Sequence, residues 1–396
     1  MFVMGIIFAC VALFYCFSFH RNFTDRGYVI GSDFINYWTA ARLTLSHNMM
    51  ILFDIDTYHQ AQEKLLGHTI YNVYTWSYPL PLIFFIIWLG FLSYPVGLAA
   101  WLVLTYIPYA FAVAARRPQA WGLAALLALS PASFENIDCG QNGFLSGAFM
   151  IGGLRLLEKR PIWAGILFGC LSYKPQICIL IPVALIAGRY WRALISTALT
   201  AGTLLGLSVL VFGLDAWQAY FEKIMPHMQS VLEIDPEASV KFIRMMPTGF
   251  MSARIMGASL STAYMISGAM MMVSILAVVY AFKHCRNIDL RNALMLTAVF
   301  TASPYIFNYD MPILYGGIVS FVAAIGSQLK ARDLALLSFL WFSPMLILIL
   351  NNHHIPHYER TPIVPLAIAA LLAIQLRAIY EEKRSPANGL TSSSRT

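Results

Sequence analysis

The chain has 396 residues, of which 59% are hydrophobic and 11% are charged, whereas a soluble domain is about 45–50% apolar and about 25% charged. Its mean hydropathy of +0.66 indicates that most of its length lies in a membrane. The formal charge of +7 fits Lys and Arg retained at the cytoplasmic ends of spans, and no basic patch interleaved with aromatic residues indicates a nucleic-acid partner. The six cysteines form no CxxC pair, which argues against a zinc site or a disulfide framework.

Apolar runs of spanning or near-spanning length, judged against about 20 residues for a helix that crosses a bilayer, recur along the chain. The first, at residues 2–17, lacks a basic n-region and a cleavage site, so we expect an uncleaved span. We expect one all-α polytopic membrane domain, residues 1–384, followed by a disordered cytoplasmic tail, residues 385–396. Its transmembrane helices, about twelve, are expected to begin near Phe2, Val96, Gln119, Gln141, Pro161, Gln176, Ala193, Thr262, Arg291, Met311, Asp333 and Thr361.

Lys and Arg gather in short connections between these runs, as in the pairs Arg116–Arg117, Lys159–Arg160 and Lys383–Arg384. With both termini in the cytoplasm, every such cluster faces the cytoplasm. The connections that then lie outside are longer or more polar, and the first of them, about residues 19–78, is the largest. We therefore expect a multi-pass protein of the plasma (inner) membrane with a polar extracytoplasmic surface.

Two segments of the first external connection, and a third that directly follows it, differ in pattern from the spans. Residues 34–45 and 58–66 mix apolar and polar side chains at helical spacing and predict interfacial amphipathic helices. Residues 79–92 are apolar but make only about two-thirds of a span. We expect them to form a short helix in the outer membrane face that starts at its prolines, because a crossing there would turn every later basic cluster outward.

Asp33 opens the first polar constellation, just after the first span. A carboxylate beside aromatic side chains that exclude water gains basicity and suits a general base. The alternative is that Asp33 caps the helix that begins at Phe34. The aromatic cluster at residues 74–81 is either an interfacial belt or a platform for a sugar ring or a prenyl chain.

Carboxylates and amides gather again at Glu135, Asn136, Asp138, Gln141 and Asn142, at an external helix end. Such groups bind divalent cations or sugar hydroxyls. The E-x-x-D spacing of one pair is a weak metal signal, and ordinary helix capping is the alternative.

Lys174 lies between two apolar runs and precedes Pro175. Inserting a lysine at membrane depth costs about 2.5–3.5 kcal/mol of free energy. Such a lysine therefore needs a hydrogen-bonding partner, contact with water or a functional role. Because Pro175 breaks the helix, Lys174 is expected to face an external cavity and to neutralise a lipid phosphate. The alternative is that it snorkels to the interface.

Three histidines in residues 351–360 suggest zinc, but no cysteine joins them, and contact with sugar or phosphate is favoured. Arg254 and Arg360 are further phosphate candidates, since guanidinium groups form bidentate bonds. Walker, dinucleotide-binding, G-x-S-x-G and H-E-x-x-H patterns are absent from the sequence. We expect no bound metal and no other cofactor.

In this order, these landmarks resemble glycosyltransferase family 87, the polyprenol-phosphate-mannose-dependent mannosyltransferases. The resemblance runs from about Gly31 to Tyr309. It rests on Asp33-Phe34-Ile35-Asn36-Tyr37-Trp38, Ala40-Ala41-Arg42, Leu52-Phe53-Asp54, Tyr78-Pro79-Leu80-Pro81, Tyr94-Pro95, Trp101, Gly140-Gln141-Asn142, Ala164-Gly165, Gly169, Lys174-Pro175-Gln176, Phe212-Gly213, Trp217 and Ser303-Pro304-Tyr305.

The resemblance implies a GT-C fold and inverting transfer of a sugar, mannose in the best-known members, from a polyprenyl-phosphate donor to a lipid or glycan acceptor outside the cytoplasm. It also implies that Asp33 is the base. We expect Lys174, Arg254 and Arg360 to bind the donor phosphate. The residues expected to bind the sugar or the acceptor are Asn36, Tyr37, Asp54, Tyr78, Asp138, Gln141, Asn142, Tyr309 and His353. Two alternatives stay open: a polymerase or ligase of lipid-linked glycans, and a flippase or transporter, which would need a cytoplasmic polar cavity and usually internal repeats.

Overall fold

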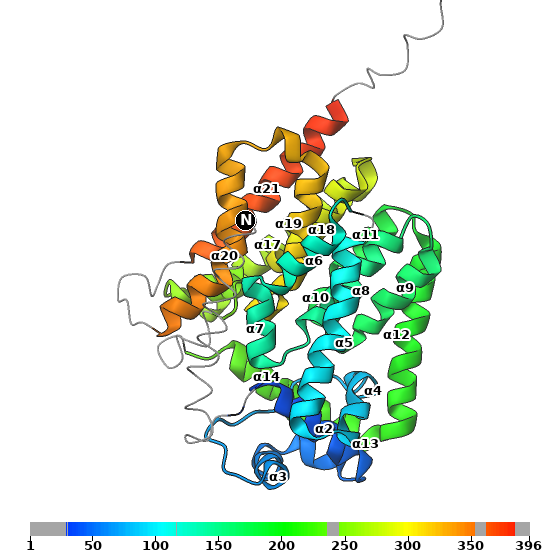
Figure 1. The fold of residues 1–396 in the computed structure, drawn as a ribbon, viewed down its shortest axis with the longest axis vertical. Coiled ribbons are helices and arrows are strands. Elements are labelled where there is room, and N and C mark those ends of the chain that lie inside the picture. Colours follow the sequence, from blue (N-terminus) through cyan, green and yellow to red (C-terminus); the bar gives the residue numbers. More distant parts are fainter. Residues whose placement is uncertain (1–28, 30, 116, 236–244, 353–361, 385–396) are drawn as a thin grey trace, which may run out of the picture.

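The computed structural model describes residue 29 and residues 31–115, 117–235, 245–352 and 362–384, which are helical and contain no strand (Figure 1). The α-helices are α2 (Phe34–Leu45), α3 (Ile55–Leu66), α4 (Leu82–Ile86), α5 (Tyr94–Ala114), α6 (Ala120–Ala128), α7 (Pro131–Cys139), α8 (Gly143–Leu156), α9 (Pro161–Cys170), α10 (Pro175–Cys178), α11 (Leu180–Ala187), α12 (Trp191–Phe212), α13 (Leu214–Ala219), α14 (Met225–Leu232), α16 (Gly249–Ile255), α17 (Leu260–His284), α18 (Ile288–Ala302), α19 (Met311–Ile325), α20 (Ala331–Asn352) and α21 (Ile363–Arg384). Short 3₁₀ helices join them, namely η1 (Met49–Phe53), η2 (Ile87–Phe91), η3 (Leu171–Tyr173), η5 (Asn308–Asp310) and η6 (Gly326–Gln328), together with one π-helix, η4 (Tyr220–Ile224), among the described residues.

Five helical segments in this part of the chain are long and apolar enough to cross a membrane: α5, α12, α17, α21 and the run Asn308–Gln328 around α19. The expectation of an all-helical membrane protein is therefore confirmed. Helices α8, α9 and α11 have 14, 10 and 8 residues, fewer than the 17–25 or so that span a bilayer, so the count of about twelve spans stays a prediction. The first expected span and the tail lie outside the described residues.

Two breaks in the helices are marked by proline: the one at Pro131 divides the span expected from Gln119, and the one at Pro175 separates the spans expected from Pro161 and Gln176. Ser130 caps α7 by accepting a bond from the Ser133 N–H, and Pro131 starts the helix. Lys174 has non-helical backbone angles between η3 and α10, and Pro175 starts α10, as the sequence predicted. Irregular backbone at membrane depth is tolerated where it lines a polar interior, and polar side chains do converge at these breaks.

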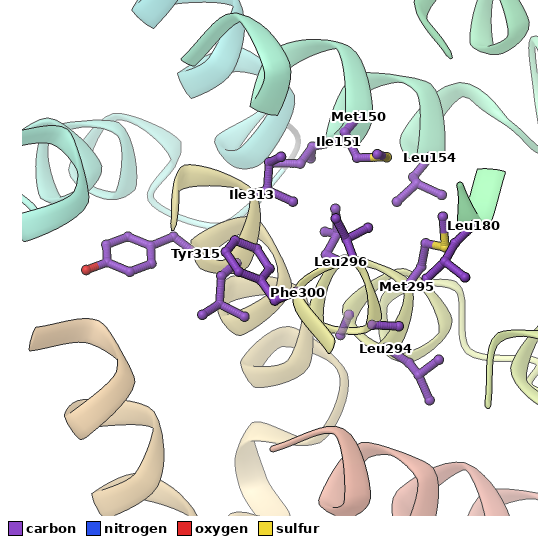
Figure 2. Packing of buried hydrophobic residues seen from close by; sticks show 14 of the residues in the cluster. Met150, Ile151, Leu154, Leu180, Leu294, Met295, Leu296, Phe300, Ile313 and Tyr315 are labelled. Atoms are coloured by element: carbon purple, nitrogen blue, oxygen red, sulfur yellow. The ribbon is translucent and has the colours of Figure 1, made fainter. Parts of the chain in front are cut away.

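Helix α18 lies at the centre of the largest hydrophobic core. Its residues from 290 to 302 are all buried, as is typical of a helix enclosed on every side. Met150, Ile151 and Leu154 of α8 pack toward Leu296 of α18 and Ile313 of α19 (Figure 2). This core holds α8 and α19 side by side, so that their first turns meet.

Helices α2, α3 and α4 gather at one end of the molecule, while the last turns of α21 project from the other (Figure 1). The predicted bounds of α2 are confirmed, but the helix is buried from residue 34 to residue 41 instead of being amphipathic. The reason is that α3, α4 and η2 pack around it. Helix α3 buries only Tyr58 and Gln62 and starts at Ile55, three residues before the predicted helix. The apolar helical run Leu82–Phe91 is too short to cross a bilayer.

Glycines allow α9 to pack closely against α12. A Cβ on Gly165 would lie 2.4 Å from the Ala193 carbonyl oxygen, and a Cβ on Gly169 would lie 2.5 Å from Thr200 Cβ. Small residues at helix contacts are typical of membrane proteins, because dispersion contacts rather than hydrophobic burial drive the association there.

We predict that Gly165→Leu destabilises the protein by about 1–3 kcal/mol, as overpacking does. The matched control is Gly202→Leu, since Gly202 is exposed on α12 and a Cβ added to it would have no atom within 4 Å. The thermal unfolding midpoint of each variant in detergent measures the effect. Equal midpoints for the two variants would show that α9 and α12 do not pack in this way.

Candidate active site

Asp33 lies at the start of α2, next to the C-terminal end of α7. Its backbone N–H donates to the Cys139 carbonyl oxygen at 2.8 Å. Its side chain makes no capping bond to α2. Instead, Asp33 Oδ2 accepts a bond of 2.7 Å from Gln141 Nε2, so the alternative of a helix cap is wrong.

Burial raises the pKa of Asp33 to about 6, in spite of the bond from Gln141, which lowers the pKa. The charge of Asp138, a half-buried residue of α7, raises it further. Such a carboxylate is still mostly ionised at pH 7 and is a stronger base than an ordinary aspartate. It therefore suits removal of a proton from a hydroxyl group.

Gln141 and Asn142 connect α7 to α8, after Gly140 ends α7 in the left-handed conformation with φ 66°. Gln141 Oε1 accepts bonds from the hydroxyls of Tyr37 (2.6 Å) and Tyr78 (3.0 Å). Asn142 Nδ2 donates to the Tyr37 hydroxyl at 3.0 Å. The structure thus brings together four proposed residues from three separate segments of the sequence.

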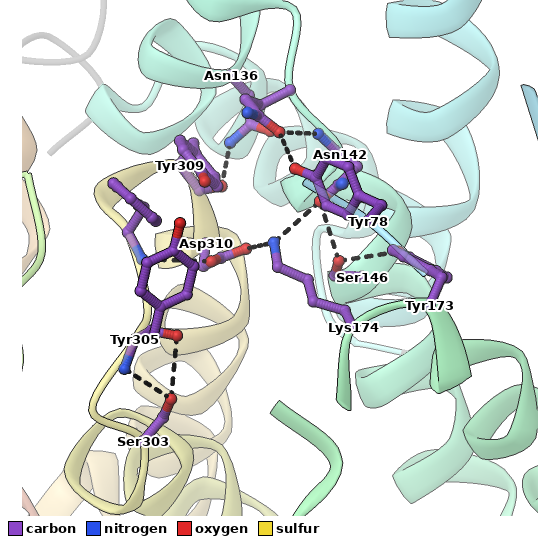
Figure 3. Close-up of polar contacts among 12 residues, drawn as sticks. Tyr78, Asn136, Asn142, Ser146, Tyr173, Lys174, Ser303, Tyr305, Tyr309 and Asp310 are labelled. Atoms are coloured by element: carbon purple, nitrogen blue, oxygen red, sulfur yellow. Dashed lines mark hydrogen bonds and ion pairs between the residues drawn. The ribbon is translucent and has the colours of Figure 1, made fainter. Parts of the chain in front are cut away.

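The Lys174 ammonium group donates to Asp310 Oδ1 at 2.5 Å and to Asn142 Oδ1 at 2.9 Å (Figure 3). Lys174 is 2% exposed and Asp310 is 0% exposed, so the alternative that Lys174 snorkels to the interface is wrong. The ring of Tyr309 lies 5.1 Å from the ammonium nitrogen. Sequence reasoning missed Asp310, although a carboxylate directly before an apolar helix is a natural partner for a buried lysine.

A close contact at the start of α8 holds Asp310 near Asn142. Gly143 is required there, because an added Cβ would lie 1.8 Å from the Tyr309 carbonyl oxygen. Asn136 Nδ2 donates to the same carbonyl at 2.6 Å. The loop before α19 is thereby fixed against α7 and α8.

Tyr78, Tyr305 and Tyr309 lie around the Lys174–Asp310 pair (Figure 3). Burial raises the pKa of the Tyr305 phenol, and the charges of Tyr78, Asp33 and Asp310 raise it further. Aromatic faces with polar edges suit a sugar ring. Tyr305 was part of the resemblance but was not proposed as a site residue.

Two of the proposed residues have other contacts. Asp54 is exposed and caps α3, accepting a bond of 3.0 Å from the Thr57 N–H. Asn36 Oδ1 accepts a bond of 3.1 Å from Gln62 Nε2, which fixes α2 to α3. In the described ranges, no group of three or more His, Cys, Asp or Glu residues is arranged to hold a metal ion.

The arginine and histidine candidates are not brought into this network. Arg254 Nη1 donates to the Ala258 carbonyl oxygen at 2.8 Å, just after α16, and no contact recorded among the described residues joins Arg254 to Lys174. His353 and Arg360 lie outside the described residues.

We predict that Lys174→Met destabilises the protein by about 3–5 kcal/mol, because it leaves the Asp310 carboxylate buried without its cation. The double variant Lys174→Met/Asp310→Asn removes both charges and should recover most of that loss. Thermal midpoints in detergent report both effects. A double variant no more stable than Lys174→Met would contradict the assigned pairing.

Comparison with known proteins identifies a family for this chain. No curated protein and no solved structure matches the chain. The family model of glycosyltransferase family 87 matches residues 76–304, more than half of the chain. The matched stretch contains Gln141, Asn142 and Lys174, whereas Asp310 lies shortly after it and Asp33 well before it. The chain belongs to glycosyltransferase family 87.

Proposed function

We propose that this glycosyltransferase transfers a hexose, mannose, with inversion from a polyprenyl-phosphate donor to a lipid or glycan acceptor. The reaction takes place at the extracytoplasmic face of the plasma (inner) membrane, in a GT-C-like fold of about twelve transmembrane helices. The observation that carries the proposal is that one hydrogen-bonded network joins a basic carboxylate, Asp33, to a buried cation, Lys174. Membership of the family supports glycosyl transfer.

Asp33 acts as the general base in this proposal. Its Oδ2 is held by Gln141, and no recorded hydrogen bond from the described residues reaches Oδ1, which is therefore the oxygen offered to the acceptor. Asp33 takes the proton of the acceptor hydroxyl as that oxygen attacks the anomeric carbon. The bond from this carbon to the phosphate oxygen breaks on the opposite side, and its electron pair leaves with the polyprenyl phosphate.

Lys174 stabilises the leaving phosphate, which gains negative charge as the sugar departs. One such fixed electrostatic contact contributes about 10²–10³ in rate. Since Asn142 and Asp310 already take two of the three ammonium donors, the phosphate uses the third donor or exchanges with Asp310. Arg254 and Arg360 remain proposed phosphate ligands.

The proposed sugar and acceptor contacts are of two kinds. The rings of Tyr78 and Tyr305 lie beside the cation (Figure 3), and the ring of Tyr309 stacks on Phe307 and lies under the ammonium group. Such an aromatic lining supports a place for the sugar there. Asn36, Asp54, Asp138 and His353 remain proposed contacts, and neither a metal nor another cofactor takes part.

The charge distribution supports an extracytoplasmic site. Basic residues occupy the last turns of α17 and α21, namely Lys283, Lys383 and Arg384, and such ends are retained in the cytoplasm. The end of the molecule that carries α2, α3 and α4 is opposite to the end of α21 (Figure 1). Asp33 is at the start of α2, on the side away from that basic end.

The donor class is tested by incubating the purified protein with radiolabelled polyprenyl-phosphate mannose and, separately, with labelled polyprenyl-diphosphate sugars. We expect label to reach a lipid or glycan acceptor from the monophosphate donor alone. Transfer from diphosphate donors alone would identify a polymerase or ligase. Movement of lipid-linked sugar across vesicles without any transfer would identify a flippase.

We predict that Asp33→Asn lowers kcat/KM by about 10²–10⁴-fold, the usual contribution of a general base, while Asp56→Asn, at an exposed position of α3, leaves it unchanged. The wild-type kcat/KM should fall about tenfold per pH unit below the Asp33 pKa of about 6, because protonated Asp33 accepts no proton. The pH–rate profile of the wild-type enzyme measures this limb. Near-normal transfer by Asp33→Asn would exclude the assignment.

A further inference from the structure

The hydrogen bonds that connect Lys174 to Asp33 all run in one direction. Lys174 Nζ donates to Asn142 Oδ1 (2.9 Å), and Asn142 Nδ2 donates to the Tyr37 hydroxyl (3.0 Å). The Tyr37 hydroxyl donates to Gln141 Oε1 (2.6 Å), and Gln141 Nε2 donates to Asp33 Oδ2 (2.7 Å). Each donor is on the Lys174 side of its acceptor.

The chemistry of the two ends fixes this direction. An ammonium group only donates, and an ionised carboxylate only accepts. The oxygen of the Asn142 amide must therefore face Lys174, and the nitrogen of the Gln141 amide must face Asp33. Tyr37 links the two amides, because its hydroxyl accepts a bond from Asn142 Nδ2 and donates its one proton to Gln141 Oε1 at 2.6 Å, which is closer than the Tyr78 hydroxyl at 3.0 Å.

Burial makes such a chain strong. Tyr37 and Asn142 are fully buried and Gln141 is 5% exposed, so water does not compete for these bonds. In a medium of low dielectric constant, successive hydrogen bonds polarise one another. The Lys174 ammonium group thereby favours the ionised form of Asp33, although Asp310 neutralises the net charge of Lys174.

We propose that Tyr37 is a positioning residue for the base, through which the Lys174 ammonium group orients and stabilises the Asp33 carboxylate. Gln141 and Asn142 are the other links of this chain, so these three residues hold the base rather than contact the sugar. The inference rests on the proposed function only in calling Asp33 the base. The chain also explains why Asp33 presents Oδ1, since Gln141 keeps Oδ2 occupied.

Other groups also act on Asp33 and stay unchanged in the test. Asp33 interacts electrostatically with Asp138 and the Cys139 thiol of α7, and with the phenols of Tyr78 in the first loop, Tyr94 in α5, and Tyr305 and Tyr309 before α19. Of these groups, Tyr78 also donates to Gln141 Oε1, at 3.0 Å. Tyr37→Phe leaves that bond in place and removes the link between the Asn142 side chain and Gln141, so a shift of the Asp33 midpoint reports on the link through Tyr37.

The test measures protonation of Asp33 without any sugar substrate. Dicyclohexylcarbodiimide modifies protonated carboxyl groups, and mass spectrometry of the Asp33 peptide gives the rate of modification at each pH. We expect a wild-type midpoint at pH about 6. Tyr37→Phe should move the midpoint upward by about 0.5–1 pH unit, the equivalent of one weakened hydrogen bond to the charged form.

The matched control is Tyr58→Phe. Tyr58 is an equally buried tyrosine whose hydroxyl donates to the Asn36 carbonyl oxygen at 2.8 Å, outside the chain, and its variant should keep the wild-type midpoint. A Tyr37→Phe midpoint equal to the wild-type value would overturn the proposal. Should Tyr37→Phe not fold, Asn142→Ser cuts the neighbouring link and must give the same upward shift.

The Lys174 end of this series of hydrogen bonds gives an independent measurement. The charge-balanced variant Lys174→Met/Asp310→Asn should also move the Asp33 midpoint upward. Adding Tyr37→Phe to it should move the midpoint no further, because both changes interrupt one chain. Additive shifts would overturn the proposal. Since labelling needs no glycosyl transfer, a protein that shows these shifts but transfers no sugar would refute the proposed function and leave this inference standing.

Discussion

The ion pair between Lys174 and Asp310 is the contact on which the site depends. Removing two opposite charges from water costs several kcal/mol for each ion, and only a close pair with further hydrogen bonds offsets that cost. Here the pair is 2.5 Å apart and Asn142 accepts a second bond from the ammonium group. The break before α10, the glycine at the start of α8 and the loop before α19 all serve to place these three side chains together.

The two charged groups of the site, Lys174 and Asp33, have different surroundings. The Lys174 ammonium group is neutralised by Asp310 and buried, whereas Asp33 is half-buried and has one carboxylate oxygen that no other described residue occupies. A base must be reached by the acceptor, and a buried cation needs only to lie near the charge that develops on the leaving group. The arrangement therefore suits transfer of a group between an anionic donor and a neutral hydroxyl.

Membrane architecture explains why this polar network can exist at all. The core around α18 holds α8 and α19 together through apolar contacts, while the polar groups are at helix ends and breaks. Backbone groups freed at such breaks need partners that lipid does not supply. The Asn136 side chain donates a hydrogen bond to the Tyr309 carbonyl oxygen, and the Asp310 carboxylate accepts one from the Phe307 N–H. The same bonds that satisfy the backbone also fix the catalytic candidates.

Local features of the chain could be predicted from the sequence: the membrane class from composition, the bounds of α2 from its pattern, and the break at Pro175 from the missing N–H of proline. The family also followed from an ordered series of short motifs. The burial of α2, the partner of Lys174 and the direction of the amide groups of Gln141 and Asn142 were decided by the tertiary structure alone. These features depend on contacts between segments far apart in the chain, and hydropathy and helical spacing describe only neighbours along it.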